Sequence, residues 1–223
     1  MRRTDVLACT ILIALAPWNR CAAAEHDYAR WEKDVAAFEK ADRKNPPPRG
    51  AVLFVGSSTI VRWKTLAADF PNHSVINRGF GGNQICDSTY YAERMIFPYE
   101  PGMIFLRAGS NDINSGKSPE QVFADFREFV AKVRRKLPNV PIVYIGVAPT
   151  VARWKNVDRE KKLNSLIGEF AKQTPDTAYI DCDTLTLGPD GQPRPELFVE
   201  DKLHLNADGY RLLVERVRPY LPK

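Results

Sequence analysis

Short apolar runs alternate with longer amphipathic stretches along the sequence, and this alternation restricts the possible folds more than any other feature. The apolar runs are residues 51–55, 74–77, 103–106, 142–147 and 177–181. They are rich in β-branched and bulky apolar residues, as strands buried on both faces of a parallel sheet require. Residues 28–38 and 122–133 carry apolar side chains at helical spacing, and each stretch is followed by proline. The pattern predicts an α/β fold with three α/β/α layers around a five-stranded, mainly parallel sheet.

The first 24 residues have the composition of an export signal. Arg2 and Arg3 precede an apolar run at residues 6–16, and Ala22-Ala23-Ala24 matches a cleavage site. The run is too short to span a bilayer, and no later segment offers about twenty apolar residues, so we expect no stable membrane insertion. We therefore predict a signal peptide at residues 1–24, one domain at residues 25–223, and a periplasmic or secreted location.

The charge and the cysteines add weaker constraints. The formal net charge of +5 falls to about +3 without the leader, which is too little to predict nucleic-acid binding. Cys86 and Cys182 remain after cleavage, in a compartment that permits disulfides. Their spacing does not decide whether they pair, but each lies in a segment expected to be partly buried, which favours two separate thiols.

Ligands of open parallel sheets bind beyond the carboxyl ends of the strands, so the residues that follow each apolar run are the candidates for a site. Gly56-Ser57-Ser58-Thr59 follows the first run. Such a turn places a hydroxyl at the start of a helix, where a helix cap is the ordinary interpretation. Ile60 stands where the motif G-x-S-x-G has its second glycine, so the turn by itself does not establish a nucleophile.

Two further turns offer hydrogen-bond donors. The glycine-rich turn at residues 77–84 follows the second run, and its backbone N–H groups are suited to an anionic oxygen. Phosphate binding is the competing interpretation, but the P-loop pattern and the dinucleotide spacing are both absent. Asn111 follows the third run and offers a side-chain amide, although an Asx turn is the ordinary use of such an asparagine.

The segment Asp201-Lys202-Leu203-His204 places a carboxylate three residues before one of only three histidines. Asn206 is a good N-cap for a last helix at residues 206–218. In a short loop before that helix, Asp201 can hold Nδ1 of His204 and leave Nε2 to act as general base for a serine.

These four segments, in this order, resemble the SGNH or GDSL hydrolase superfamily, over residues 52–210. The resemblance implies a flavodoxin-like SGNH hydrolase fold, with Ser58 as nucleophile and Asp201 with His204 as the rest of the triad. It further implies that the Ser58 backbone N–H, Gly82 and Asn111 form the oxyanion hole. The implied reaction is hydrolysis of a carboxylic ester through an acyl-enzyme, which needs no metal or cofactor.

Two positions depart from the family pattern. Ser57 stands where the family has aspartate, so the turn carries two hydroxyls, of which the alignment favours Ser58. Arg107 precedes the third segment, where we expect an aromatic or small residue. Pairing with a buried acid is the favoured role for Arg107, because buried arginines need partners, and contact with an acidic substrate is the alternative.

The substrate is less constrained by the sequence. Trp154 and Phe198 are placed to line the pocket, and aromatic rings suit either a sugar face or an acyl chain. Core packing is the alternative role for Trp154. Export favours a small-molecule or carbohydrate ester with a short acyl group, such as O-acetyl. Lysophospholipase or thioesterase action at the same site is an alternative, as is an inactive glycan-binding module that retains the fold. The sequence carries no signal for an oligomeric state.

Overall fold

The structure is a computed structural model that describes residues 26–222. The predicted signal peptide, with Cys9 and Cys21, lies outside these residues. Five parallel strands form one sheet in the order β2-β1-β3-β4-β5. They are β1 (Val52–Gly56), β2 (Val75–Gly79), β3 (Met103–Arg107), β4 (Ile142–Ile145) and β5 (Thr177–Ile180). Each overlaps the predicted apolar run, so the predicted parallel α/β architecture is confirmed.

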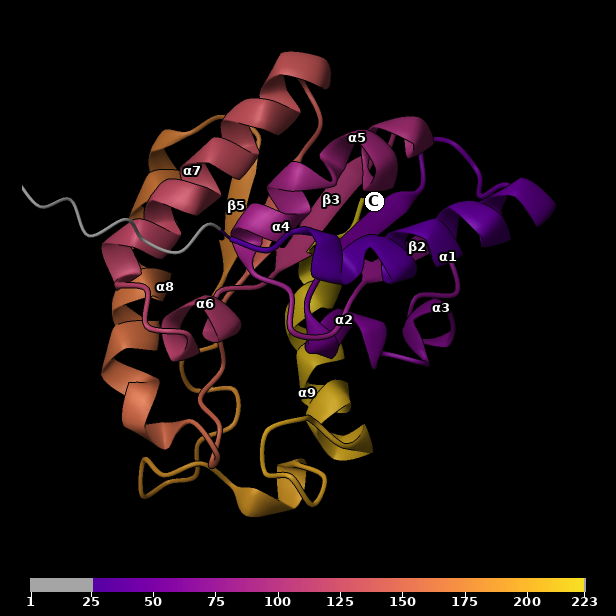
Figure 1. The fold of residues 1–223 in the computed structure, drawn as a ribbon. Coiled ribbons are helices and arrows are strands. Elements are labelled where there is room, and N and C mark those ends of the chain that lie inside the picture. The colour runs from indigo at the N-terminus through magenta and orange to yellow at the C-terminus, as the bar shows by residue number, and fades with distance from the viewer. Residues whose placement is uncertain (1–25, 223) are drawn as a thin grey trace, which may run out of the picture.

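One face of the sheet is covered by α4 (Ile85–Tyr90), α7 (Pro119–Lys136) and α8 (Val157–Gln173) (Figure 1). Strand residues such as Leu53, Ile104 and Tyr144 point to this face and pack against Phe126 of α7 and Ile167 of α8 in one buried cluster. Helix α7 begins with a capping box at Ser118 and ends at Lys136, two residues before Pro138. It corresponds to the helical pattern predicted at residues 122–133.

The opposite face is covered by α2 (Ser58–Val61), α3 (Leu66–Asp69) and α9 (Ala207–Val217). The alternate strand residues, including Phe54 and Phe105, form a second buried cluster there with Trp63 and Leu213. The rings of Phe54 and Phe105 stack at 4.7 Å between centroids. Burial on both faces explains why the strand sequences read as continuous apolar runs and not as alternating ones.

The N-terminal part forms a smaller third cluster beside these layers. A 3-10 turn at Ala29–Trp31 leads into α1 (Glu32–Lys44), which packs against α5 (Ala92–Met95). Trp31 and Val35 contact Phe80 there, in the turn that follows β2. The predicted helix at residues 28–38 is therefore present, and it packs against the glycine-rich turn that follows β2.

The remaining short elements are connectors. They are α6 (Ser110–Asn114) and 3-10 turns at Phe97–Tyr99, Trp154–Asn156, Pro195–Leu197 and Arg218–Tyr220. Cys86 is half-buried and Cys182 is buried, and both are free thiols. No helix within residues 26–222 is long and apolar enough to cross a membrane.

Candidate active site

Strand β1 delivers Ser58 to the carboxyl edge of the sheet through a turn that only glycine can make. Gly56 has φ of +139°, and a Cβ atom there would lie 2.1 Å from the backbone oxygen of Arg107. The Ser57 N–H donates to that same oxygen at 2.9 Å, which ties the turn to β3. Ser57 is the N-cap of α2, and Ser58 is its first residue. The turn therefore lifts Ser58 above the sheet between two neighbouring strands.

His204 and Asp201 meet Ser58 in the geometry of a catalytic triad. The Nε2 atom of His204 lies 3.0 Å from Oγ of Ser58. Its Nδ1 lies 2.6 Å from Oδ2 of Asp201. Ser58 and His204 are half-buried, whereas the Asp201 side chain is 43% exposed. The structure thus joins residues that are 146 positions apart in the chain, with distances suited to proton transfer.

The loop that carries the pair is organised by Asp201 itself. Its Oδ1 accepts from the backbone N–H groups of Leu203 and His204, at 2.9 Å each. These hydrogen bonds, above all the one from the His204 side chain, hold the pKa of the Asp201 carboxyl well below its usual value. Asn206 then caps α9 by accepting from the N–H groups of Asp208 and Gly209, as the sequence predicted.

The Asn111 amide is fixed by two contacts. Its Nδ2 donates to the backbone oxygen of Asn83 at 2.9 Å, and its Oδ1 accepts from Nη2 of Arg153 at 2.9 Å. An amide nitrogen has two hydrogens, so one N–H remains after the bond to Asn83. The contact with Arg153 determines which end of the amide is the nitrogen. Asn111 is therefore held ready to donate to an additional oxygen.

Gly82 supplies a second donor beside Asn83. Its φ is +78°, and a Cβ atom there would lie 3.0 Å from the Trp31 ring, so glycine suits this turn. Neither the Gly82 N–H nor the Ser58 N–H donates a hydrogen bond to another group of residues 26–222. Both are therefore available to an oxyanion.

A buried network behind Asn111 was not predicted from the sequence. Nη1 of Arg153 donates to Oγ of Ser110 at 2.9 Å, and that hydroxyl donates to Oε1 of Glu160 at 2.7 Å. Glu160 is 2% exposed, and burial raises the pKa of its carboxyl. One signal was readable, because Glu160 interrupts the apolar stripe of α8 that Leu163 and Ile167 continue. For Arg153 the signal was its place in the loop after β4.

A pocket of about 40 Å³ opens beside Ser58 and His204. Its lining includes Arg107, Phe198, Cys182 and Leu185. Trp154 is half-buried and does not line this pocket.

Arg107 is 8% exposed, yet no carboxylate among the described residues lies within ion-pair distance of its guanidinium. The pairing with a buried acid that the sequence favoured is thus not found within residues 26–222.

Asp112, next to Asn111, is a buried structural acid. It is 0% exposed, and its Oδ1 accepts from the Ile85 N–H at 3.1 Å, which joins α6 to α4. Lys117 lies 3.9 Å away. Burial raises the pKa of Asp112 to about 6. Asp112 thus anchors the short helix that carries Asn111.

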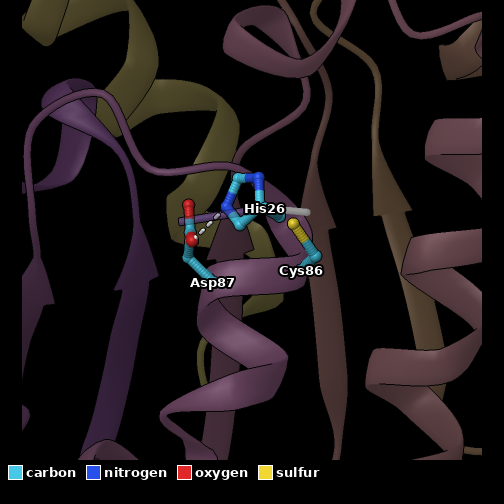
Figure 2. A group of neighbouring side chains, drawn as sticks. All are labelled: His26, Cys86 and Asp87. Carbon is cyan, nitrogen blue, oxygen red and sulfur yellow. Dashed lines mark hydrogen bonds and ion pairs between the residues drawn. The ribbon is translucent and has the colours of Figure 1, made fainter. Parts of the chain in front are cut away.

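His26, Cys86 and Asp87 form the one group of three possible metal ligands found within residues 26–222 (Figure 2). Their donor atoms already have partners. Nε2 of His26 lies 2.7 Å from Oδ1 of Asp87, and Nζ of Lys117 lies 3.4 Å from Sγ of Cys86. Burial raises the pKa of the Cys86 thiol to about 11, so it stays protonated at neutral pH. The His26 side chain ties the N-terminal segment to α4 through Asp87.

A serine, a histidine and an aspartate joined by hydrogen bonds at the edge of an α/β/α domain are typical of hydrolases that act through an acyl-enzyme. The GDSL-like lipase/acylhydrolase family model matches residues 51–212, and the chain belongs to this family. As a member, it is an enzyme of the ester hydrolase class.

Relatives agree with this assignment. The platelet-activating factor acetylhydrolase IB subunit alpha1 of Bos taurus is 27% identical over 180 residues, which cover 76% of this chain and 73% of that protein. A putative platelet activating factor structure from Streptococcus pneumonia superposes with a TM-score of 0.77 at 18% identity, covering 87% of this chain and 94% of that one. A carbohydrate esterase of family 3 from Talaromyces cellulolyticus gives 0.59 at 17% identity, covering 76% and 94%. At these identities the two solved structures establish the fold alone.

Proposed function

We propose that this protein is an exported serine esterase that removes a short acyl group, such as acetyl, through Ser58, His204 and Asp201. The observation that carries the proposal is the hydrogen-bonded chain from Ser58 Oγ through the His204 ring to Asp201. A serine hydroxyl is a weak nucleophile until a base lies within hydrogen-bond distance, and this geometry supplies that base.

In the proposed mechanism, Oγ of Ser58 attacks the ester carbonyl carbon while Nε2 of His204 takes the hydroxyl proton. Asp201 fixes the His204 tautomer and stabilises the imidazolium that forms. The carbonyl oxygen becomes an oxyanion that accepts from the N–H groups of Ser58 and Gly82 and from the free amide N–H of Asn111. His204 then protonates the departing alcohol, and a water molecule activated by His204 hydrolyses the acyl-enzyme.

The size of the pocket supports a short acyl group. The pocket has a volume of about 40 Å³ beside Ser58, so it is small enough to favour a compact acyl group such as acetyl. A long acyl chain needs a groove that extends well beyond this space. The pocket thus favours a short-chain esterase over a lysophospholipase or a long-chain thioesterase.

Export and a carbohydrate ester are the finer parts of the proposal. The sequence pattern of residues 1–24 supports export, and N-terminal sequencing of the protein from the periplasm or medium tests it: we expect the chain to begin near Glu25. One solved structure with this fold is described as a carbohydrate esterase and another as an acetyl esterase. These descriptions motivate a search among acetylated sugars.

Reaction with a fluorophosphonate tests the nucleophile directly. Intact mass should show one adduct on the wild type and on Ser57→Ala, and none on Ser58→Ala. Ser57 is the matched control because it is a hydroxyl on the same turn, and it is 9% exposed. If the folded wild type takes no adduct, the enzyme proposal fails and an inactive glycan-binding module becomes the better interpretation.

A series of p-nitrophenyl esters tests the acyl length. We expect the highest kcat/KM for acetate or propionate and a decline as the chain lengthens, because the pocket has little room. A preference for chains of eight or more carbons would instead support lysophospholipase or thioesterase action.

A further inference from the structure

The charge in the pocket beside Ser58 does not match a neutral substrate. The pocket is lined by 17 residues, among which are two guanidinium groups, Arg107 and Arg153, and no carboxylate. Arg153 is committed to Ser110 and Asn111. The Arg107 side chain donates no hydrogen bond to any residue in the described part of the chain. The residue is 8% exposed, and none of its guanidinium nitrogens is among the fully buried polar atoms without a partner, so these nitrogens are open to the pocket.

A guanidinium without a partner in the protein keeps its N–H donors free, so it can bind an anionic group that enters the pocket. Glu160 is a candidate counter-ion, since burial raises the pKa of its carboxyl and the charge of Arg107 opposes that rise. Oε1 of Glu160 accepts a hydrogen bond from Ser110, and no ion pair joins Glu160 to Arg107 within the described residues. Glu160 is therefore not a direct partner of the Arg107 guanidinium.

Arg107 extends from the end of β3, on the side of the sheet where Cys182, Leu185 and Leu213 also line the pocket. These apolar neighbours lower the local polarity, which strengthens the attraction between a guanidinium and an anion. A guanidinium in such a setting binds a carboxylate with two parallel hydrogen bonds.

We propose that Arg107 is a specificity residue that binds a carboxylate of the substrate, so that the natural ester is anionic. This inference rests on the proposed esterase function and narrows its substrate class. The carboxylate belongs either to the alcohol part of a short-acyl ester or to the acyl part of a half-ester of a small dicarboxylic acid. Both sources present the same group to Arg107.

Two matched ester pairs distinguish the sources. The first pair is 4-acetoxybenzoate and its methyl ester, in which the charge is in the alcohol part. Release of the phenol measures its hydrolysis. The second is monophenyl succinate with phenyl methyl succinate, where the charge is in the acyl part. Each rate is corrected for the reaction without enzyme. The wild type should prefer the anionic member of one pair in kcat/KM.

Arg107→Met should lower that preference by about tenfold or more, because it removes a charge-assisted pair of hydrogen bonds. Lys155→Met is the matched control, since it removes one positive charge from an exposed residue near the site and should change the ratio by less than about twofold. An unchanged ratio in Arg107→Met for both pairs, or a wild type that prefers the neutral member of both, overturns the proposal.

A measurement without turnover separates this inference from the esterase proposal. Calorimetric titration with succinate should show binding to the wild type that Arg107→Met weakens by about tenfold. Equal affinities would overturn the inference even if ester hydrolysis were demonstrated, whereas the esterase proposal is judged by phenyl acetate hydrolysis in the wild type and in Ser58→Ala.

Thermal melting then shows whether Arg107 is structural. The Arg107 guanidinium has no partner in the described part of the chain, so an apolar side chain of similar length removes no stabilising contact, and the Tm of Arg107→Met should equal or exceed that of the wild type. A clear fall in Tm would indicate a structural partner and count against the proposal. Should Arg107→Met fail to fold, Arg107→Gln keeps a polar side chain without the charge and serves in the same assays.

Discussion

The two sides of Ser58 are built in different ways. On the side proposed for proton transfer, Asp201 and His204 lie three residues apart in one loop, and the Asp201 side chain is 43% exposed. On the side proposed for the oxyanion, Asn111 depends on Asn83 and Arg153, which come from the loops after β2 and β4. The first side is a local motif, and only its contact with Ser58 depends on the rest of the fold. The second side forms only when the sheet brings three loops together, so the position of each of its residues depends on the others.

The largest predicted effect tests the proton-transfer side. His204→Ala should lower kcat/KM for a short ester by on the order of 10⁶-fold, because no base remains to accept the Ser58 proton. Asp201→Asn should cost on the order of 10⁴-fold, since the His204 tautomer is no longer fixed. Steady-state assays with p-nitrophenyl acetate measure both.

Lys202→Ala, an exposed neighbour in the same loop, is the control and should retain near wild-type activity. A His204→Ala variant that keeps a tenth or more of the wild-type rate would show that the local motif is not the catalytic base, and the comparison between the two sides would lose its basis.

Asn111→Ala tests the oxyanion side, where the expected loss is smaller. Removing one donor should lower kcat by about 10²- to 10³-fold and leave KM nearly unchanged, because the hydrogen bond forms fully only in the transition state. The Ser58 and Gly82 N–H groups would maintain the remaining activity. Single-turnover measurements of acylation isolate this step. Asn139→Ala removes an exposed amide elsewhere and should behave as wild type.

Two aspartates extend the comparison to stability. Asp201 is exposed with a lowered pKa, so its contribution to stability is present above its unfolded pKa and is lost only as the pH falls. Asp112 on the oxyanion side is buried, and its pKa is raised from 3.8 to about 6. Its contribution is fully present below its unfolded pKa and is lost as the pH rises through about 6.

Asp112→Asn should therefore reduce the loss of unfolding free energy between pH 4 and pH 7 by about 2 kcal/mol, which is most of the value of a two-unit pKa shift. Urea unfolding at both pH values measures this difference, with the exposed Asp158→Asn as control. The same pH slope in the wild type and in Asp112→Asn would mean that Asp112 is not a destabilised buried acid.

The features that could be predicted from the sequence are those formed by residues close together in the chain. The strands were predictable because apolar runs buried on both faces have a composition of their own. The Asp201 and His204 pair was visible because three residues separate them, and Asn206 marked the helix that follows.

The oxyanion side was only partly visible. Asn111 and Gly82 were found through resemblance to a family, whereas the support from Arg153, Ser110 and Glu160 depends on how β3, β4 and α8 pack together. The unpaired state of Arg107 was not predictable either, since it depends on which acids the fold leaves out of reach. Contacts between segments that are distant in the chain have no characteristic residue spacing, so a single sequence does not reveal them.

The smallest predicted effect decides whether the buried network acts through Asn111. Arg153→Met should lower kcat by about tenfold with little change in KM, because the Asn111 amide loses the contact that orients it. In an Asn111→Ala background the same substitution should have almost no further effect, so the double-mutant cycle should give a coupling close to the whole loss. Lys155→Met controls for the loss of charge nearby. Additive losses in the cycle would mean that Arg153 acts on the substrate or on the fold, and that the oxyanion side is less interdependent than its hydrogen bonds indicate.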